Sequence, residues 1–116
     1  MALSIIPLLR KSGILDRIKT MDYLLQVFKA LGNKRRFEII ELLLEKKELS
    51  LEEISKQLKI PKNTCCRNLK VLEKVHLINS KIRKGNAYYF LNRPKDHPYN
   101  NPLFNLIEFR KQRRHY

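Results

Sequence analysis

The sequence predicts a mainly α protein (α+β) in which four helices precede a two-stranded β-hairpin and one further helix follows it. Two periodicities support this prediction. Over most of residues 14–75, apolar residues recur every three or four positions, as in helices with one buried face. Over residues 78–83 they alternate with polar residues, as in a strand. The length of 116 residues favours a single domain, residues 1–116, with a core of modest size.

The first predicted helix begins near residue 14 and ends at Gly32. Its apolar residues step by four, three, four and three positions, which is the heptad seam of a helix that pairs with another helix. We therefore assign residues 1–32 to an N-terminal helical region that serves dimerisation. The seam consists of Ile14, Ile18, Met21, Leu25 and Phe28.

Three more helices are expected in close succession. The second covers residues 33–47, and its broad apolar face predicts a central position. Ser50 and Glu53 have the spacing of a capping box, so a third helix is expected over residues 51–58. A proline then suits the start of a fourth helix, over about residues 62–75.

The hairpin is expected over residues 78–92, with Gly85-Asn86 as its two-residue turn. With this turn Ile82 opposes Tyr89, and both are expected on the inner face. The outer face then takes basic and aromatic side chains, namely Lys81, Arg83, Tyr88 and Phe90. A last helix is expected over residues 101–116, and it ends in a basic tail.

The charge of the chain is large and unevenly distributed. There are 25 Lys and Arg residues against 11 Asp and Glu, for a formal net charge of +14. Residues 22–58 carry seven basic and seven acidic groups, net zero, whereas residues 59–95 carry ten basic groups and one acidic group, net +9. A merely solvated surface would spread its charge more evenly, so this asymmetry predicts a nucleic acid as the partner.

The fourth helix has two faces of opposite character. At about 100° per residue, Cys65, Leu69 and Leu72 fall on one apolar stripe. The opposite face carries Asn63, Arg67, Lys70 and Lys74. A short helix, a three-residue turn and a second helix with such a face form a helix-turn-helix, whose second helix enters the major groove. The following basic hairpin is then the wing. The predicted fold is a winged helix-turn-helix over residues 33–92, with a two-stranded β-hairpin wing and extra N- and C-terminal helices.

The roles of the side chains follow from their donor geometry. Arg67 is expected to bind a guanine edge bidentately, and Asn63 or Asn68 to pair with adenine. Lys62, Thr64 and Lys70 are expected to bind phosphates. Such contacts position the protein on the DNA without selecting a base sequence. The candidate DNA-binding residues are Lys62, Asn63, Thr64, Cys66, Arg67, Asn68, Lys70, Lys74, Lys81, Arg83, Lys84 and Asn86.

Residues 27–92 resemble the ArsR family of winged helix-turn-helix repressors. The matching pieces, in chain order, are "ALGNKRRFEII", "LSLEEISKQLKI", "NTCCRNLKVLEKVHLI" and "RKGNAYYFLN". The resemblance implies a homodimeric transcriptional repressor that pairs through its first and last helices. It also implies binding of double-stranded DNA at a palindromic operator, which such repressors often release when a ligand binds.

The metal sites of the family are not matched. Ser50 and Glu52 stand where its metal sensors carry a Cys-x-Cys pair. A second family site would need acidic and His ligands along the last helix, where this chain offers only Asp96-His97 and His115. Zinc requires about four well-placed ligands, so neither a metal nor another cofactor is expected. Cys65 is expected to fill the core, and Cys66 to touch phosphate.

Other function classes are less well supported. The sequence has no glycine-rich phosphate loop and no nucleophile with a plausible base, so no enzyme is expected. It lacks the roughly 20 consecutive apolar residues of a membrane-spanning helix, and we expect a cytoplasmic protein. Two alternatives stay open: a winged-helix module for protein interactions within a larger assembly, and an RNA-binding winged helix. The sequence identifies no operator and no small-molecule effector, and it does not distinguish a repressor from an activator.

Overall fold

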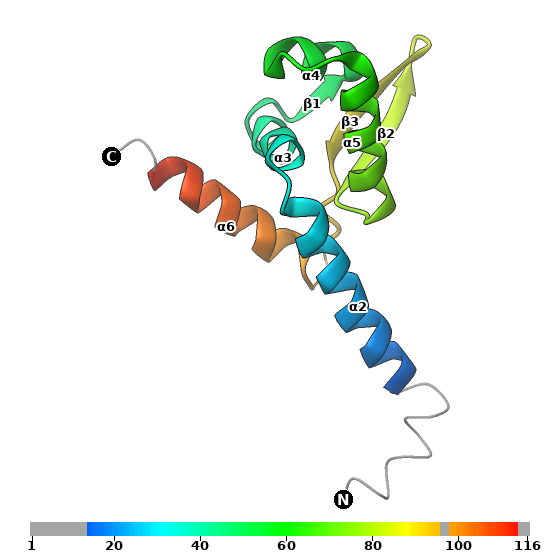
Figure 1. Cartoon of the computed structure of the whole chain (residues 1–116), viewed down its shortest axis with the longest axis vertical. Helices are drawn as coiled ribbons and strands as arrows, with labels where there is room; N and C mark the ends of the chain where they lie inside the picture. Colours follow the sequence, from blue (N-terminus) through cyan, green and yellow to red (C-terminus); the bar gives the residue numbers. More distant parts are fainter. Residues whose placement is uncertain (1–13, 96–97, 114–116) are drawn as a thin grey trace, which may run out of the picture.

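The computed structural model describes residues 14–95 and 98–113 (Figure 1). The elements, in chain order, are α2 (Ile14–Leu31), α3 (Lys34–Lys46), β1 (Glu48–Ser50), α4 (Leu51–Leu58), α5 (Lys62–Lys74), β2 (Ile78–Arg83), β3 (Asn86–Leu91) and α6 (Asn100–Arg113). The predicted winged helix-turn-helix is confirmed. The helices α3, α4 and α5 and the sheet form a head, from which α2 and α6 diverge below (Figure 1).

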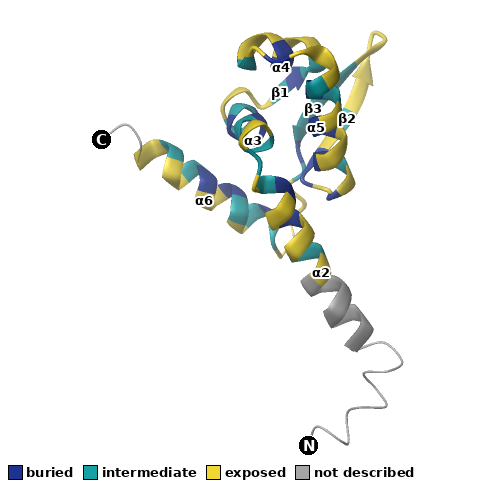
Figure 2. Cartoon of the chain, viewed as in Figure 1, coloured by how far each residue is buried: buried dark blue, intermediate teal, exposed yellow. Residues whose placement is uncertain are grey.

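The core lies inside this head (Figure 2). Its fully buried side chains come from α3, α4, α5 and the segment after α5, and include Ile39, Ile40, Leu43, Ile54, Leu69, Leu72 and Leu77. Each of the two terminal helices also buries side chains against this core. Val27 and Ala30 of α2 are buried, as are Phe104 and Ile107 of α6. Both terminal helices are therefore docked on the head along one face only.

Local hydrogen bonds set the helix boundaries close to those predicted. Asn33 caps α3, and its side chain accepts from the Arg36 amide at 3.1 Å. Ser50 and Glu53 form the predicted capping box of α4, because each side chain accepts from the other residue's backbone amide. α6 begins one residue earlier than predicted, at Asn100.

The turn of the hairpin differs from the prediction. It is Lys84-Gly85, with φ values of 50° and 81°, instead of Gly85-Asn86. Two positive φ values are typical of a type I′ turn, whose twist matches that of the strands. The register therefore shifts by two residues. Ile82 pairs with Ala87, so its predicted pairing with Tyr89 is wrong. A shift of two leaves every side chain on its predicted face.

The sheet has a third strand that the sequence analysis missed. β1 pairs with β3 in antiparallel register, with Leu49 opposite Tyr89, and the strand order is β1-β3-β2. Three residues are too few to show a period of two. The predicted core position of Ile82 is also wrong. Its side chain is 75% exposed, because it lies near the turn, where the hairpin extends beyond the helices (Figure 1).

Ion pairs hold α6 against α3. Arg110 lies 3.1 Å from the Glu41 carboxylate, and Lys111 lies 2.8 Å from that of Glu45. The Lys111 hydrogen bond lowers the pKa of Glu45 below its ordinary value. These contacts hold the polar side of α6 against α3 of the same chain. None of the helices within the described residues is long and apolar enough to span a membrane.

Candidate nucleic-acid interface

The interface begins with the two faces of α5. Cys65, Leu69 and Leu72 are 0% exposed and form the face that packs into the core. The opposite face carries exposed polar and basic side chains, namely Asn63, Arg67, Lys70 and Lys74. The predicted division of this helix is therefore confirmed. An exposed amide, a guanidinium and two ammonium groups lie along one side of a helix whose other side is anchored.

A three-residue turn, residues 59–61, fixes α5 against α4. Lys59 ends α4 in the left-handed conformation, with φ of 56°. The Ser55 hydroxyl donates to the Ile60 carbonyl at 2.5 Å, and the Ile60 amide donates back to the Ser55 carbonyl at 3.1 Å. Because both ends of this turn are hydrogen-bonded, the angle between the two helices is held.

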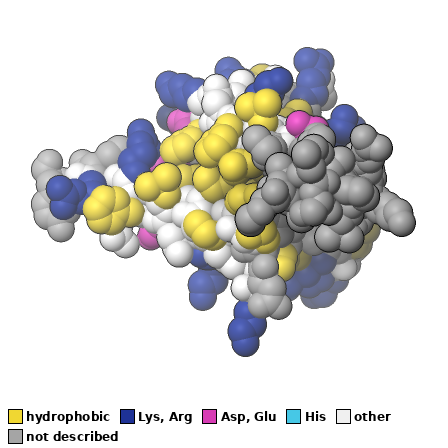
Figure 3. All heavy atoms as spheres, turned by 90° about the horizontal axis from the view of Figure 1, so that it is seen from below, with side chains coloured by type: hydrophobic (Ala, Val, Ile, Leu, Met, Phe, Trp, Pro, Cys, Tyr) yellow, Lys and Arg dark blue, Asp and Glu magenta, His cyan; other side chains and the backbone are white. Residues whose placement is uncertain are grey.

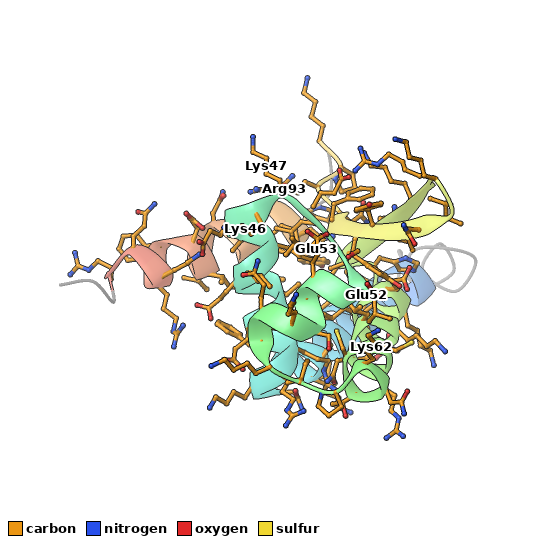
Figure 4. All side chains as sticks on the ribbon, turned by 90° about the horizontal axis from the view of Figure 1, so that it is seen from above. Lys46, Lys47, Glu52, Glu53, Lys62 and Arg93 are labelled. Carbon is orange, nitrogen blue, oxygen red and sulfur yellow. The ribbon has the colours of Figure 1, made fainter. Side chains whose placement is uncertain are left out.

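The first turn of α5 suits a phosphate. Pro61 precedes it, and the turn has neither a side-chain cap nor an acidic residue. Its amide groups therefore remain available to an anion. Lys62 lies 3.2 Å from Glu52 of α4, and both side chains are more than 60% exposed (Figure 4). An exposed pair of this kind contributes about 0–1 kcal/mol, so Lys62 can exchange Glu52 for a phosphate at little cost.

Asn68 is not on the exposed face. Its side chain is 8% exposed, and its carbonyl oxygen accepts from Nη1 of Arg36 at 3.2 Å. Arg36 in turn donates from Nε to the Ala30 carbonyl at 2.7 Å. Asn68 thus joins α5 to α3 and the end of α2, and its burial disfavours the predicted adenine contact. Thr64 and Cys66 are half-buried at the sides of the helix.

On the wing, Lys81 and Arg83 have partners within the chain. Both pair with the Glu48 carboxylate of β1, and Lys81 Nζ lies 3.1 Å from it. Lys81 also lies over the Phe90 ring at 5.6 Å, and Arg83 over the Tyr88 ring at 4.7 Å. These contacts hold both cations on the outer face of the sheet. The exposed residues at the tip are Ile82, Lys84 and Asn86.

Comparisons with known proteins agree with this geometry. Residues 31–81 match the family model of a helix-turn-helix domain. Mb0332 of Mycobacterium bovis, described as a homodimeric winged helix-turn-helix DNA-binding domain and a possible ArsR-family transcriptional regulator, superposes with a TM-score of 0.70 at 25% identity, over 83% of this chain and 84% of that chain. HlyU of Vibrio cholerae superposes with a TM-score of 0.67 at 25% identity, over 77% and 91%.

The chain has a winged helix-turn-helix fold. Its fold is that of DNA-binding transcriptional regulators and not of enzymes. PagR of Bacillus anthracis, described as a transcriptional repressor, has the same fold, with a TM-score of 0.66 at 19% identity over 78% of this chain and 98% of that chain. No curated protein gives a significant sequence match.

The two cysteines of the chain differ in their surroundings. Cys65 is fully buried and Cys66 half-buried, and both thiols are free. Burial, and to a lesser extent the neighbouring Cys66, raises the pKa of the Cys65 thiol to about 11. Burial likewise raises the pKa of Tyr89, which packs against the core. Cys65 is therefore a protonated core side chain, as predicted.

The two positions compared above with the Cys-x-Cys pair of the ArsR metal sensors make other contacts in this chain. Ser50 caps α4, and Glu52 pairs with Lys62. Over residues 14–95 and 98–113, no three His, Cys, Asp or Glu side chains are grouped to hold a metal ion. Asp96, His97 and His115 lie outside the described residues. That no metal or cofactor acts on this protein stays a prediction.

Two structural roles near the interface were not predicted. Arg36 supports α5 through Asn68, and the helical angle of Asn68, next to Leu72, contained the signal for its burial. Asn100 is also fully buried, and no sequence pattern pointed to it, because a helix-starting asparagine is ordinarily a solvated cap.

Proposed function

We propose that the chain is a sequence-specific regulator that binds double-stranded DNA as a homodimer, recognises a palindromic operator and represses transcription. The observation that carries the proposal is the exposed basic face of α5, opposite a fully buried apolar stripe. A helix of this form on a helix-turn-helix scaffold fits the major groove. A protein-interaction module would need no such face.

Within this proposal Arg67 binds a guanine edge and Asn63 an adenine, because both are exposed on the central part of the face. Lys70, Lys74 and the amino-terminal turn of α5, with Lys62, contact phosphates. Among the wing residues, Lys84 and Asn86 are the proposed DNA contacts, because both are exposed. Thr64 and Cys66 contact the DNA backbone from the sides of α5.

The proposed dimer uses apolar side chains that the head leaves exposed. Leu25 and Phe28 of α2 and Leu106 and Phe109 of α6 are between 53% and 64% exposed. Figure 3 shows hydrophobic side chains gathered on this lower face, with Lys and Arg around it. A gathered apolar patch of this kind is typical of an interaction site.

The free energy gained by burying these side chains in a dimer is comparable to the cost of association. Burying the exposed part of each of the four side chains contributes roughly 1–2 kcal/mol, or roughly 8–16 kcal/mol from two protomers. The cost of association is about 4–15 kcal/mol. The seam side chains Ile14, Ile18 and Met21 lie outside the residues whose side chains are described. We propose that they extend the interface.

The repressor role rests on the ArsR resemblance and is supported by the description of PagR as a repressor. A two-fold dimer would set its recognition helices about one DNA turn apart, roughly 34–36 Å, on one face of the duplex. A regulator of this kind works in the compartment that holds the DNA, so the cytoplasmic location expected from the sequence is part of the proposal.

The test is selection of preferred sequences from a random duplex pool by the full chain. A two-fold symmetric consensus is the expected result, and duplex RNA should not compete for the bound DNA. Arg67→Ala/Lys70→Ala should lose the enrichment, whereas Lys46→Ala/Lys95→Ala removes the same charge from exposed sites elsewhere and should keep it. Absence of any enrichment with the unmodified chain, or equal binding of duplex RNA, would overturn the proposal.

A further inference from the structure

A polar cluster with a buried centre lies where α2 and the start of α6 meet the end of α5. Its centre is Asn100, the first residue of α6, whose side chain is 0% exposed. The Asn100 amide nitrogen donates to the carbonyls of His76 and Asn92, each at 2.9 Å. Its carbonyl oxygen accepts from the Tyr23 hydroxyl of α2 at 3.2 Å. One side chain therefore bonds residues of three other segments.

The His76 carbonyl belongs to the end of α5. His76 adopts the left-handed conformation, with φ of 61°, and its amide donates to the Glu73 carbonyl at 2.9 Å. The Leu77 amide closes the helix with a second bond, to the Leu72 carbonyl at 3.0 Å. Val75 is the C-cap of α5, and His76 is the left-handed residue that follows it. Left-handed backbone is unfavourable for His, and the surrounding bonds hold it.

The wing is joined to the same point. The Asn92 side chain donates to the His76 carbonyl at 2.9 Å, and the Asn92 amide donates to the Leu77 carbonyl at 2.9 Å. Asn92 directly follows β3, the second strand of the wing hairpin. The His76 carbonyl thus accepts from both Asn92 and Asn100, so the end of α5, the end of β3 and the start of α6 share one acceptor.

Tyr23 extends the cluster to α2. Its ring lies 6.5 Å from that of His76 at an angle of 30°, and 6.0 Å from that of Tyr99. Burial raises the pKa of Tyr23, so the phenol is a protonated donor to Asn100 at neutral pH. The cluster consists of Tyr23, His76, Asn92, Tyr99 and Asn100.

We infer that Asn100 and Tyr23 are positioning residues that set the distance and angle between the two recognition helices of the dimer, and therefore the half-site spacing that it accepts. The inference rests on the proposed function. Apolar contacts between helices permit small rotations, whereas directional hydrogen bonds to a buried amide favour one arrangement. α2 and α6 carry the proposed dimer surface, and this cluster is where both contact the end of α5.

The spacing of half-sites is a sensitive readout of this arrangement. One inserted base pair turns the second half-site by roughly 34–36° around the DNA axis and moves it by roughly 3.4 Å. A dimer with fixed recognition helices cannot follow this change and loses the advantage of binding both half-sites, which reaches roughly 10²-fold or more. A dimer with loosened recognition helices can adjust in part to the new position of the second half-site and keeps part of this advantage.

The experiment compares the full-length protein with Tyr23→Phe, Asn100→Leu and a control, Asn105→Ala. Tyr23→Phe deletes one hydroxyl, and Asn100→Leu keeps a similar volume without the hydrogen bonds. Asn105 is an exposed asparagine on the same helix. The probes are the consensus duplex selected by the unmodified protein, the same duplex with one base pair inserted or deleted at its centre, and a single half-site.

The unmodified protein and Asn105→Ala should lose at least roughly tenfold in affinity when the spacing changes, and the two cluster variants less than roughly threefold. All four proteins should bind the single half-site equally. Unchanged spacing discrimination in both Tyr23→Phe and Asn100→Leu would overturn the inference. So would unchanged discrimination in Tyr23→Phe together with a loss in Asn100→Leu that is matched by equally weakened half-site binding. If Asn100→Leu does not fold, by circular dichroism, Tyr23→Phe decides alone. Failure of the unmodified protein to select a two-half-site duplex would refute the proposed function instead.

Discussion

Arg67 and Asn68 are adjacent in the sequence and have opposite positions in the structure. Arg67 is exposed on the basic face of α5, whereas Asn68 is 8% exposed and bonded to Arg36. A helix turns by about 100° per residue, so neighbours on it seldom share a role. Arg67 is therefore the residue to test for reading bases, and Asn68 for holding the helix.

Arg67→Ala is expected to cost about 1–3 kcal/mol of binding free energy on the preferred sequence and to relax base choice at one position, because a bidentate contact to guanine is lost. Titration of the selected duplex and of its single-base variants measures both effects. Lys70→Ala is the matched control, since it should weaken all sequences alike. A uniform loss with both variants would make Arg67 a phosphate contact only.

Substitutions in the wing turn should affect the stability of the fold and the affinity for DNA in different ways. Lys84 has a positive φ of 50° and is exposed. Lys84→Asn should stabilise the fold by about 0.5–1 kcal/mol, because Asn tolerates this conformation and Asn-Gly suits the turn. The same change removes a proposed phosphate contact, so DNA affinity should fall while the melting temperature rises. Thermal unfolding followed by circular dichroism and a DNA titration measure the two quantities.

Gly85→Ala should have the opposite effect on stability. No atom lies within 4 Å of an added Cβ at Gly85, but the φ of 81° is unfavourable for alanine. This variant should lose roughly 1–2 kcal/mol of stability with no change of charge. Equal stabilities of Lys84→Asn, Gly85→Ala and the unmodified chain would contradict the type I′ assignment.

At the residue scale, the helical projection was sufficient for most of α5. It placed Cys65, Leu69 and Leu72 in the core and Arg67 on the opposite face, as the structure has them. The same projection places Asn68 beside Leu72, although its polar side chain favoured a DNA contact over burial. It could not find the ion pairs of Glu48, since a carboxylate on one strand meets Lys81 and Arg83 only once the sheet is assembled.

At the scale of elements, α6 divides its apolar residues between two tasks. Phe104 and Ile107 are buried in the core of their own chain, and Leu106 and Phe109 are exposed by 64% and 59%. Arg110 and Lys111 fix this orientation through Glu41 and Glu45 of α3. The exposed pair therefore lies on the part of α6 that does not pack into the core of its own chain.

Leu106→Glu/Phe109→Glu should convert the proposed dimer into a monomer, because four charges would enter its interface while the monomer core is untouched. Sedimentation at micromolar concentrations measures the change. Asn105→Glu/Gln112→Glu adds the same charge at other exposed positions of α6 and is the control. Deletion of residues 1–20 should also weaken the dimer. A concentration-independent monomer of the unmodified chain would refute the dimer itself.

The elements that the sequence predicted well carry strong local signals. The capping box placed the start of α4, and proline and glycine placed the neighbouring boundaries. The hairpin turn was misplaced because Lys at a positive φ is uncommon and Gly85-Asn86 was the more ordinary candidate. β1 was missed because its three residues are a strand only through pairing with β3.

At the scale of the whole molecule, the charge asymmetry is real but partly neutralised. Among the basic residues of the segment 59–95, Lys62, Lys81 and Arg83 pair with Glu52 or Glu48 from the other segment. Sequence counting cannot show this, because each pair joins residues distant in the chain. Apart from Arg67, which is proposed to bind a base, the exposed cations of α5 and the wing outside these pairs are Lys70, Lys74 and Lys84. Lys62 would contact a phosphate only in exchange for Glu52, so it adds no net contact to this count.

These three contacts per protomer predict the salt dependence of binding. About six neutralised phosphates per dimer should give a slope of log K against log salt near −5, because each contact releases about 0.9 counterions from duplex DNA. Titrations of the selected duplex between about 50 and 200 mM salt measure the slope. Lys70→Ala removes two contacts per dimer and should reduce its magnitude by roughly 2, whereas Lys46→Ala, on α3, should leave it unchanged. Glu48→Gln should increase the magnitude if Lys81 and Arg83, once released, reach the backbone. A flat response to salt in the unmodified chain would remove the electrostatic basis of DNA binding.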